Sequence, residues 1–490
     1  MNETIAWIAL PFFVGFVIYL LPQLARWLAL AIALVSAVYA LTIFLQPSPL
    51  NIQLLDSFGV SLIIDRLSGF FILTNALVTA AIVIYCWTTG KTTFFYMQTI
   101  VLHGSVNATF VCADLISLYV ALEVIGVATF LLISYPRTDR SIWVGLRYLF
   151  VSNTAMLFYL VGALLVYKAN NSFHYEGLSN SPPEAVALIF LGLLAKGGIF
   201  VSGLWLPLTH SESQSPVSAM MSGVVVKAGV FPMVRFALLL EEIDPVVRLF
   251  GVGTALLGVG YAVFEKDTKR MLAFHTISQL GFVLAAPVVA GFYALTHGLV
   301  KSALFLIAGI LPSRSFKELQ HQPIDRKIWI ALVIASFSIS GFPLLSGFGA
   351  KVLTTKNLLP WQVLGMNIAA LGTAISFAKF IFLPHQSSSP NSLEGKGNQK
   401  LQLGFWLAMV ILLGGLIGAN VFYYEAYTLK NTVKPLLTIF VGWLAYLFIF
   451  KKLTVKLPRA IEKFDHLIGV MSLMSILLFW IMWAQSEGLI

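Results

Sequence analysis

Charged residues are scarce in this chain of 490 residues: Asp, Glu, Lys and Arg together make up 11% of it, against 58% for hydrophobic residues. Soluble globular proteins carry about 25% charged residues, most of them on a surface that faces water. The scarcity therefore excludes a soluble globular protein and indicates a chain whose outer surface lies in a lipid bilayer.

Cysteine is nearly absent as well. Cys86 and Cys112 lie in or beside apolar segments at an unrelated spacing, which argues against a disulfide framework or a cysteine metal site. The sequence also lacks a GxGxxG or Walker loop leading into a helix, an HExxH pair, and a cluster of His and carboxylate residues at ligand spacing. We therefore expect no cofactor, no metal and no catalytic chemistry of the chain's own.

Long apolar runs are abundant. A helix needs about 20 apolar residues to cross roughly 30 Å of hydrocarbon. Such runs occupy residues 5–21, 25–45, 67–87, 95–113, 115–135, 143–167, 185–206, 217–239, 246–264, 271–290, 292–312, 328–350, 361–384, 402–422, 432–450 and 466–485. We predict an all-α polytopic membrane protein with about 14–16 transmembrane helices, in which residues 1–490 form a single transmembrane domain.

The formal net charge of +10 is explained by membrane topology. Of the 31 Lys and Arg residues, about eighteen lie in loops after odd-numbered segments and six in loops after even-numbered ones. Cytoplasmic loops carry the excess of positive charge in membrane proteins. We therefore expect the odd-numbered loops in the cytoplasm and both termini outside, and nucleic acid is not needed as a partner.

Glycine and proline interrupt two of the apolar segments in a similar way. The seventh segment runs through Gly198 and Gly203 to Pro207, and the twelfth runs through Gly341 and Pro343. Broken membrane helices are tolerated only where protein or water satisfies the freed backbone groups. Both breaks therefore indicate a polar interior, the alternative being a proline kink without a functional role.

The two interrupted segments lie five segments apart. This spacing predicts a first five-helix repeat over residues 95–240 and a second over 246–384, followed by extra C-terminal helices at 402–490. Because five is odd, the second repeat must begin at the opposite face of the membrane. Inverted repeats with ion sites on discontinuous helices near the midplane are typical of transporters.

Seven Lys and Arg residues fall within the apolar segments. A cation at the centre of a bilayer costs between about 3 and more than 10 kcal/mol, so it marks a candidate functional site unless its side chain reaches the headgroups. Those near segment ends, which we expect to reach the headgroups, are Arg147, Arg235 and Lys379, and those at greater depth or beyond a break are Lys196, Lys227, Lys301 and Lys351.

An acidic residue lies at the same depth as these lysines. Glu123 is close to the centre of the fifth segment, and a carboxylate there can stay charged if it faces an ammonium group. We predict that Glu123 pairs with Lys196, with a purely structural ion pair as the alternative.

Histidines complete the series of titratable groups. His297 and Lys301 are four residues apart and share one helix face. His275 and His210 are further candidate relay groups, although a lone buried histidine is more often a hydrogen-bonded core residue. Groups of this kind can accept a proton and pass it on.

Several motifs together resemble one known family. They are Glu123 in the fifth segment, Lys196, WLP, SPVSAMMSGVVVKAGVF, DTKRMLAFHTISQLGF, HGLVKSALFLIAG and SGFPLLSGFGAK, spread over residues 60–385. This combination is similar to the antiporter-like membrane subunits shared by respiratory complex I, membrane-bound hydrogenases and Mrp-type cation/proton antiporters. Lys351, where one complex I subunit has Glu, and the chain length resemble the D-type subunit of the Mrp antiporters most.

The resemblance implies a fold, partners and site residues. It implies a proton-translocating subunit of a multisubunit Na⁺/proton antiporter, assembled with other membrane subunits in a bacterial inner membrane. The roles of the family's buried proton-transfer residues would fall on Glu123, Lys196, Lys227 and Lys351, with His297 and Lys301 between the two halves.

The sequence departs from the family's pattern after Lys196. Where the family commonly reads FPLHxWLPDAH, Val201 replaces a proline, Gly203 a histidine and Leu208 an aspartate. Three hypotheses stay open at this point: a member of a multisubunit sodium/proton antiporter, a member of a redox-driven complex I-like or hydrogenase assembly, and a scaffold that has lost transport. The departures favour the scaffold, whereas the buried charges argue against it, since nothing else would offset their desolvation.

Overall fold

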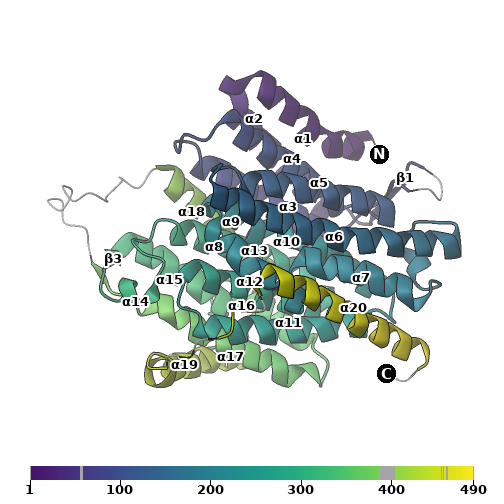
Figure 1. Ribbon diagram of the computed structural model, residues 1–490. Helices are drawn as coiled ribbons and strands as arrows, with labels where there is room; N and C mark the ends of the chain where they lie inside the picture. The colour runs from purple at the N-terminus through teal and green to yellow at the C-terminus, as the bar shows by residue number, and fades with distance from the viewer. Residues whose placement is uncertain are drawn as a thin grey trace.

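The computed structural model describes residues 2–55, 59–386, 403–453, 455, 457–459 and 462–488. Its helices lie side by side in one bundle, and the marked ends of the chain lie at the same end of that bundle (Figure 1). All sixteen predicted segments are helical, and thirteen helices of the described residues are long and apolar enough to cross a membrane. The prediction of an all-α polytopic membrane protein is confirmed.

The N-terminal part supplies the first six spans. Its helices are α1 (Asn2–Leu20), η1 (Pro22–Leu24), α2 (Ala25–Leu45), α3 (Arg66–Tyr85), α4 (Thr93–Thr109), α5 (Leu115–Ile133), α6 (Asp139–Asn170) and η2 (Tyr175–Leu178). Between α2 and α3, β1 (Leu50–Gln53) pairs antiparallel with β2 (Ser61–Ile64), so that Leu50 faces Ile64.

The central part holds the two broken spans. Its helices are α7 (Pro183–Gly197), η3 (Phe200–Trp205), α8 (Leu206–Glu212), α9 (Ser215–Met220), the π-helical turn η4 (Met221–Val225), α10 (Val226–Leu239), α11 (Asp244–Phe264), α12 (Thr268–Ala285), η5 (Pro287–Val289), α13 (Ala290–Ala308), α14 (Phe316–Leu319), α15 (Arg326–Ser340), α16 (Ser346–Lys356) and α17 (Gln362–Ile381). Two short strands, β3 (Ile324–Asp325) and β4 (His385–Gln386), pair in parallel.

The C-terminal part adds α18 (Leu403–Asn420), η7 (Val421–Ala426), α19 (Leu429–Ala445), the π-helical turn η8 (Tyr446–Phe450) and α20 (Phe464–Ser486). In Figure 1, α19 lies at the edge of the bundle, whereas α20 crosses in front of its centre.

Polar residues gather in the middle of the bundle, and apolar ones face outward. Every residue of α12 and of α13 is buried, including Lys269, His275, Gln279 and Lys301. The outer helices instead expose large apolar side chains, as expected of a surface in contact with lipid. Hydropathy alone does not select α12 as a span, because the helix carries many polar side chains. The surrounding helices bury these side chains.

Both predicted breaks are present. In the seventh span, α7 ends at Gly198, which has φ +69°, and the chain continues through η3 into α8. In the twelfth, α15 ends at Gly341, with φ +85°, and α16 begins five residues later, at Ser346. Positive φ is strained for residues other than glycine, so these two glycines determine where each helix stops.

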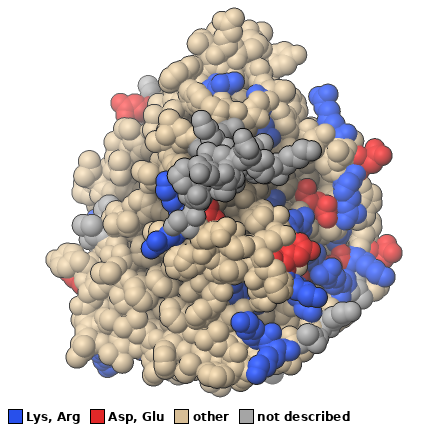
Figure 2. Space-filling model, turned by 90° about the vertical axis from the view of Figure 1, so that its left-hand side faces the viewer, with Lys and Arg blue, Asp and Glu red and all other residues tan. Residues whose placement is uncertain are grey.

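Lys and Arg gather on the end of the bundle formed by the odd-numbered loops. Figure 2 shows this end, where β3 and α14 lie in Figure 1, and many of its charged side chains are Lys or Arg with Asp and Glu among them. The asymmetry counted in the sequence therefore corresponds to one face of the molecule.

Candidate functional site

Lys196 lies in the last turn of α7, with only 3% of the residue exposed. Its ammonium donates a hydrogen bond to Ser152 Oγ of α6 at 2.7 Å. It also rests against α5, because a β-carbon built on Gly126 would lie 2.9 Å from Lys196 Nζ. The early end of α7 and the missing side chain at Gly126 together make room for this ammonium group.

Glu123 lies one helical turn before Gly126 on α5. It is half-buried, and its Oε1 atom is enclosed without a hydrogen-bond partner from the described chain. The Glu123 carboxylate and the Lys196 ammonium are near enough to influence each other electrostatically. No ion pair within 4.0 Å joins them in the described part of the chain, so the structure brings the two groups into one region but leaves Lys196 bonded to Ser152.

Lys227 lies just after the π-helical turn of the eighth span. Its fully buried ammonium donates to Gly223 O at 2.6 Å and to Ser222 O at 3.2 Å. A π-turn takes backbone carbonyls out of the regular helical pattern, and such turns are frequent at functional sites. The turn therefore supplies oxygens to a cation at a depth where water would otherwise be needed.

Lys301 lies at the centre of the second buried cluster. Its ammonium donates to Leu272 O of α12 at 2.5 Å and lies 5.8 Å from the ring centre of Phe305 and 6.0 Å from that of Phe377. The Phe305 ring stacks on His210 of α8, with centroids 4.7 Å apart, and the Phe377 ring contacts His275 of α12 at 4.8 Å. Each of the two candidate relay histidines thus contacts an aromatic ring that lies beside Lys301.

The ring nitrogens of these histidines are unpartnered. His210, His275 and His297 are all buried, and none of their nitrogens has a hydrogen-bond partner among the described residues. Each lies within the electrostatic influence of Lys301. Buried polar atoms usually have a partner in folded proteins, so these ring nitrogens have room to bond a further polar group such as water.

His297 and Lys351 line one small cavity. The space open to water there is about 10 Å³, which is room for roughly one molecule. Lys351 Nζ is buried without a hydrogen-bond partner from the described chain, and its aliphatic stem packs on Gly341 at the break before α16. The cavity lies between His297 of α13 and the start of α16, which carries Lys351.

The sequence alone did not identify several polar residues of the site. Ser152 bonds Lys196, and Tyr293 and Gln279, which line the cavity, bond each other at 2.7 Å. Single Ser, Tyr and Gln residues occur in many apolar helices, so only their position against a buried cation identifies them. The π-turn at η4 likewise has no signal in the sequence.

The cations near segment ends have structural partners. Arg235 forms an ion pair with Asp65, and Lys379 donates to the carbonyls of Ala262 and Glu265 at the end of α11. Arg147 donates to the main-chain carbonyl of Glu462. These contacts tie helix ends together, and Lys379 is also near enough to His275 to act on it electrostatically.

Titratable side chains lie on a set of packed helices in the interior of the bundle, and groups of this kind can accept and release protons. Glu123, Lys196, Lys227, His297, Lys301 and Lys351 form a series from α5 to α16, with His210 and His275 beside Lys301. Among the described residues, no group of three His, Cys, Asp or Glu side chains is placed to hold a metal ion.

Comparison with known proteins assigns the family. The family described as NADH:quinone oxidoreductase/Mrp antiporter, transmembrane region, matches residues 112–376, more than half of the chain. The chain is 25% identical over 423 residues to the D-type subunit of a Na⁺/H⁺ antiporter from Alkalihalophilus pseudofirmus, covering 78% of this chain and 85% of the relative. It is 30% identical over 344 residues to hydrogenase-4 component B of Escherichia coli, covering 61% of this chain and 51% of the relative.

Solved structures show the same fold. A chain of the Mrp complex from Dietzia sp. matches with a TM-score of 0.76 and 20% identity, covering 100% of this chain and 60% of that one. A chain of an archaeal membrane-bound sulfane sulfur reductase matches with a TM-score of 0.74 and 20% identity, covering 91% and 99%. The protein belongs to the NADH:quinone oxidoreductase/Mrp antiporter transmembrane family.

Proposed function

We propose that this chain is a proton-translocating subunit of a multisubunit monovalent cation/proton antiporter. The observation that carries the proposal is the buried series from Lys196 through Lys227 and Lys301 to Lys351, which crosses both broken helices. The names of two relatives support the same function, since one belongs to a Na⁺/H⁺ antiporter and another to a probable K⁺/H⁺ antiporter of Rhizobium meliloti.

Each group has a role that follows from its contacts. Glu123 modulates the charge of Lys196 from the neighbouring helix, and Ser152 orients its ammonium. Protons then pass through Lys227 to His297 and Lys301, whose neighbours His210 and His275 offer free ring nitrogens. Lys351 exchanges protons with one side of the membrane, because it adjoins the break before α16 and the cavity that reaches His297.

The same proposal includes the orientation of the chain, its membrane and its partner subunits. The basic face would lie in the cytoplasm and both termini outside, in the inner membrane of a bacterium, because positive charge accumulates on cytoplasmic loops. Other membrane subunits would complete the assembly, with Na⁺ as the coupled cation. The two halves of the bundle, residues 95–240 and 246–384, would be inverted repeats, each with its broken helix fourth.

The test is cation/proton exchange in membrane vesicles that contain the chain with its partner subunits. Lys196→Ala should abolish exchange and Glu123→Ala should reduce it at least about tenfold, which corresponds to about 1.4 kcal/mol in the transport barrier. Lys430→Ala, at an exposed position of α19, serves as the matched control and should leave exchange unchanged. Unaltered exchange in Lys196→Ala at normal protein level would refute the proposal.

A second candidate keeps the same machinery but couples it to redox chemistry in partner subunits. Relatives named as a quinone oxidoreductase chain and a hydrogenase component favour it. Purifying the tagged chain with its natural partners separates the two: iron–sulfur proteins in the complex would favour redox coupling, and small membrane subunits would favour the antiporter. The scaffold hypothesis predicts that Lys196→Ala leaves both exchange and assembly intact.

A further inference from the structure

The last helix packs on the broken span that carries Lys196. Contacts of α20 reach α7, η3 and α6, and its buried residues form one stripe from Leu467 through Met471, Met474 and Leu478 to Ile481. This spacing covers one helix face. The stripe faces the bundle, whereas residues such as Leu473 and Trp480 are exposed.

The start of α20 is fixed by a charged anchor. Arg270 of α12 donates two hydrogen bonds to the Glu462 carboxylate at 2.6 and 2.7 Å, and Arg147 of α6 donates to the Glu462 main-chain carbonyl. Two residues later, the Phe464 ring packs on Phe150 of α6, with centroids 5.1 Å apart. The side chains of Arg270 and Glu462 are only 9% and 8% exposed, so the pair is largely shielded from water.

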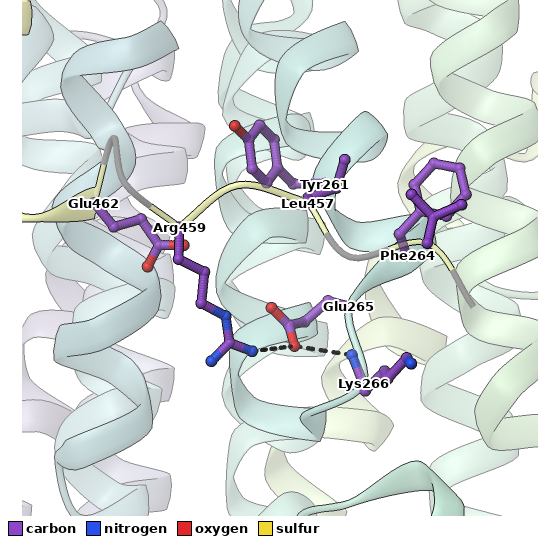
Figure 3. Close-up of a pocket in the computed structure, with 8 residues that line it drawn as sticks. Tyr261, Phe264, Glu265, Lys266, Leu457, Arg459 and Glu462 are labelled. Atoms are coloured by element: carbon purple, nitrogen blue, oxygen red, sulfur yellow. Dashed lines mark hydrogen bonds and ion pairs between the residues drawn. The ribbon is translucent and has the colours of Figure 1, made fainter.

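Other charges surround this anchor. Arg270 also bonds Glu265 at 3.2 Å, and Arg459 reaches Glu265 at 3.4 Å with a side chain that is 67% exposed. In Figure 3 the Arg459 side chain reaches the Glu265 carboxylate, and Glu462 lies beside Arg459. A pocket of about 400 Å³ lies beside them, lined also by Tyr261 and Leu457.

The far end of α20 is tied down as well. Gln485 donates to the main-chain carbonyl of Glu242, in the turn between α10 and α11. Between the two ends, Leu477 and Ile481 of α20 share an apolar groove with Phe200, the first residue of η3. Phe200 has φ +52°, which is strained for a side chain of this size, so the break requires support from its surroundings.

We propose that α20 braces the break in α7 and that Glu462 is the positioning residue of this brace. Glu462 joins α6 to α12 at the start of α20, and α20 packs on η3 and on α7, whose last turn precedes η3. Lys196 lies in that turn, which places its ammonium under the control of a residue at the end of the molecule that holds the odd-numbered loops. The brace itself is independent of transport, and only its effect on Lys196 rests on the proposed function.

Amide hydrogen exchange in the full complex tests the brace directly. Glu462→Ala should raise exchange in peptides covering 198–205 by roughly threefold or more, because a helix end freed from its anchor opens locally. Peptides of α1 and α2 should not change. Arg459→Gln is the matched control, since Arg459 lies in the same segment but is exposed. If Glu462→Ala lowers the amount of folded protein, Glu462→Gln, which keeps the side-chain shape, provides the same comparison.

Transport in the same samples tests the effect on Lys196. Glu462→Ala should lower cation/proton exchange per folded complex several-fold and shift the pH of half-maximal transport. Glu462→Asp should restore part of the activity and part of the pH profile. A loss of folded protein alone would not move the pH profile. Unchanged hydrogen exchange over 198–205 in both Glu462→Ala and Glu462→Gln overturns the brace. Absence of transport in the unmodified complex overturns the proposed function. The brace is then tested by the hydrogen-exchange data alone.

Discussion

At the scale of single residues, the buried lysines differ in how the protein satisfies them. Lys196 bonds a hydroxyl group, whereas Lys227 and Lys301 bond main-chain carbonyls. Lys351 has no hydrogen-bond partner in the described chain and faces the cavity beside His297. Hydrogen bonds from the protein therefore offset part of the desolvation of the first three lysines, whereas Lys351 Nζ lies 5.5 Å from the ring centre of Phe282 and beside the cavity.

Gly126→Ala tests how closely Lys196 must approach α5. The added methyl would lie 2.9 Å from Lys196 Nζ and would displace the end of a flexible side chain, so stability should change by less than about 1 kcal/mol. Exchange activity should nevertheless fall about tenfold, because the ammonium moves away from Ser152. Activity and thermal unfolding are measured on the same sample.

Gly260→Ala is the control for this change. Nothing lies within 4 Å of a β-carbon at Gly260 of α11, so activity and stability should match the unmodified protein. Full activity in Gly126→Ala would contradict the placement of Lys196.

Asp65→Asn tests the ion pair at the start of α3. Burial raises the pKa of the Asp65 carboxyl, but the hydrogen bonds and charge of Arg235 outweigh burial, so its pKa lies below the ordinary value. The lowered pKa adds stability above the unfolded value of about 4, and this stability is lost as the pH falls through the folded pKa. Removing one partner should cost about 3 kcal/mol at neutral pH.

Thermal unfolding from neutral pH down to about pH 3 measures this contribution. The difference between Asp65→Asn and the unmodified protein should shrink below about pH 4. Asp139→Asn, at an exposed carboxylate in the first turn of α6, should cost no more than about 1 kcal/mol. A difference that does not vary with pH would contradict the charged pair.

At the scale of elements, the break in α7 explains one departure from the family's pattern. A β-carbon at Gly203 would lie 2.2 Å from the carbonyl oxygen of Gly198, so η3 closes onto the end of α7 only because position 203 has no side chain. A histidine, which the family commonly has there, does not fit this turn. The departure therefore belongs to the geometry of the break and is weak evidence for a lost function.

Gly203→Ala and Gly203→His should both destabilise the protein. The clash is with backbone, which cannot move aside cheaply, and overpacking of this kind costs about 1–3 kcal/mol or more. The melting temperature of the purified complex and the amount of folded protein measure the effect. Gly418→Ala in α18, where nothing lies within 4 Å, is the control. Normal stability in Gly203→His would show that the break tolerates the family's residue.

At the scale of the whole molecule, the exposed and the buried cations are distributed differently. Lys and Arg gather on the end of the bundle formed by the odd-numbered loops, as Figure 2 shows. The buried cations instead lie inside, on α7, α10, α13 and α16, surrounded by helices with apolar outer faces. We expect the first pattern to orient the protein in the membrane, and the proposed proton route follows the second.

Single cysteines test the orientation. Lys452→Cys lies on the basic end and Ser179→Cys lies in the loop between α6 and α7, and both native residues are exposed. A membrane-impermeant maleimide added to intact cells should label Ser179→Cys and leave Lys452→Cys unlabelled until the membrane is opened. Background labelling should be low, because Cys86 and Cys112 are buried. The reverse labelling pattern would invert the topology.

The positions of the helices and of their breaks could be predicted, because they depend on residues that are near one another in the sequence. A run of about 20 apolar residues must form a helix in lipid, so the span positions follow from the sequence. Gly198 and Gly341 end their helices through their own φ angles, so the breaks follow as well. The depth of Lys196, Lys227 and Lys301 along their helices needs only a count of residues.

Partners could not be predicted, because they depend on how distant helices pack. Ser152 is 44 residues from Lys196, and Leu272 is 29 residues from Lys301. Glu462 meets Arg270 across 192 residues and so brings a C-terminal helix over the break in α7. The sequence by itself determined that apolar helices follow one another along the chain, that two of them are broken, and where along its helix each charge lies. The tertiary structure alone decided which oxygen atom accepts a hydrogen bond from a buried cation. The reason is that helix packing sets the distances between residues that are far apart in sequence.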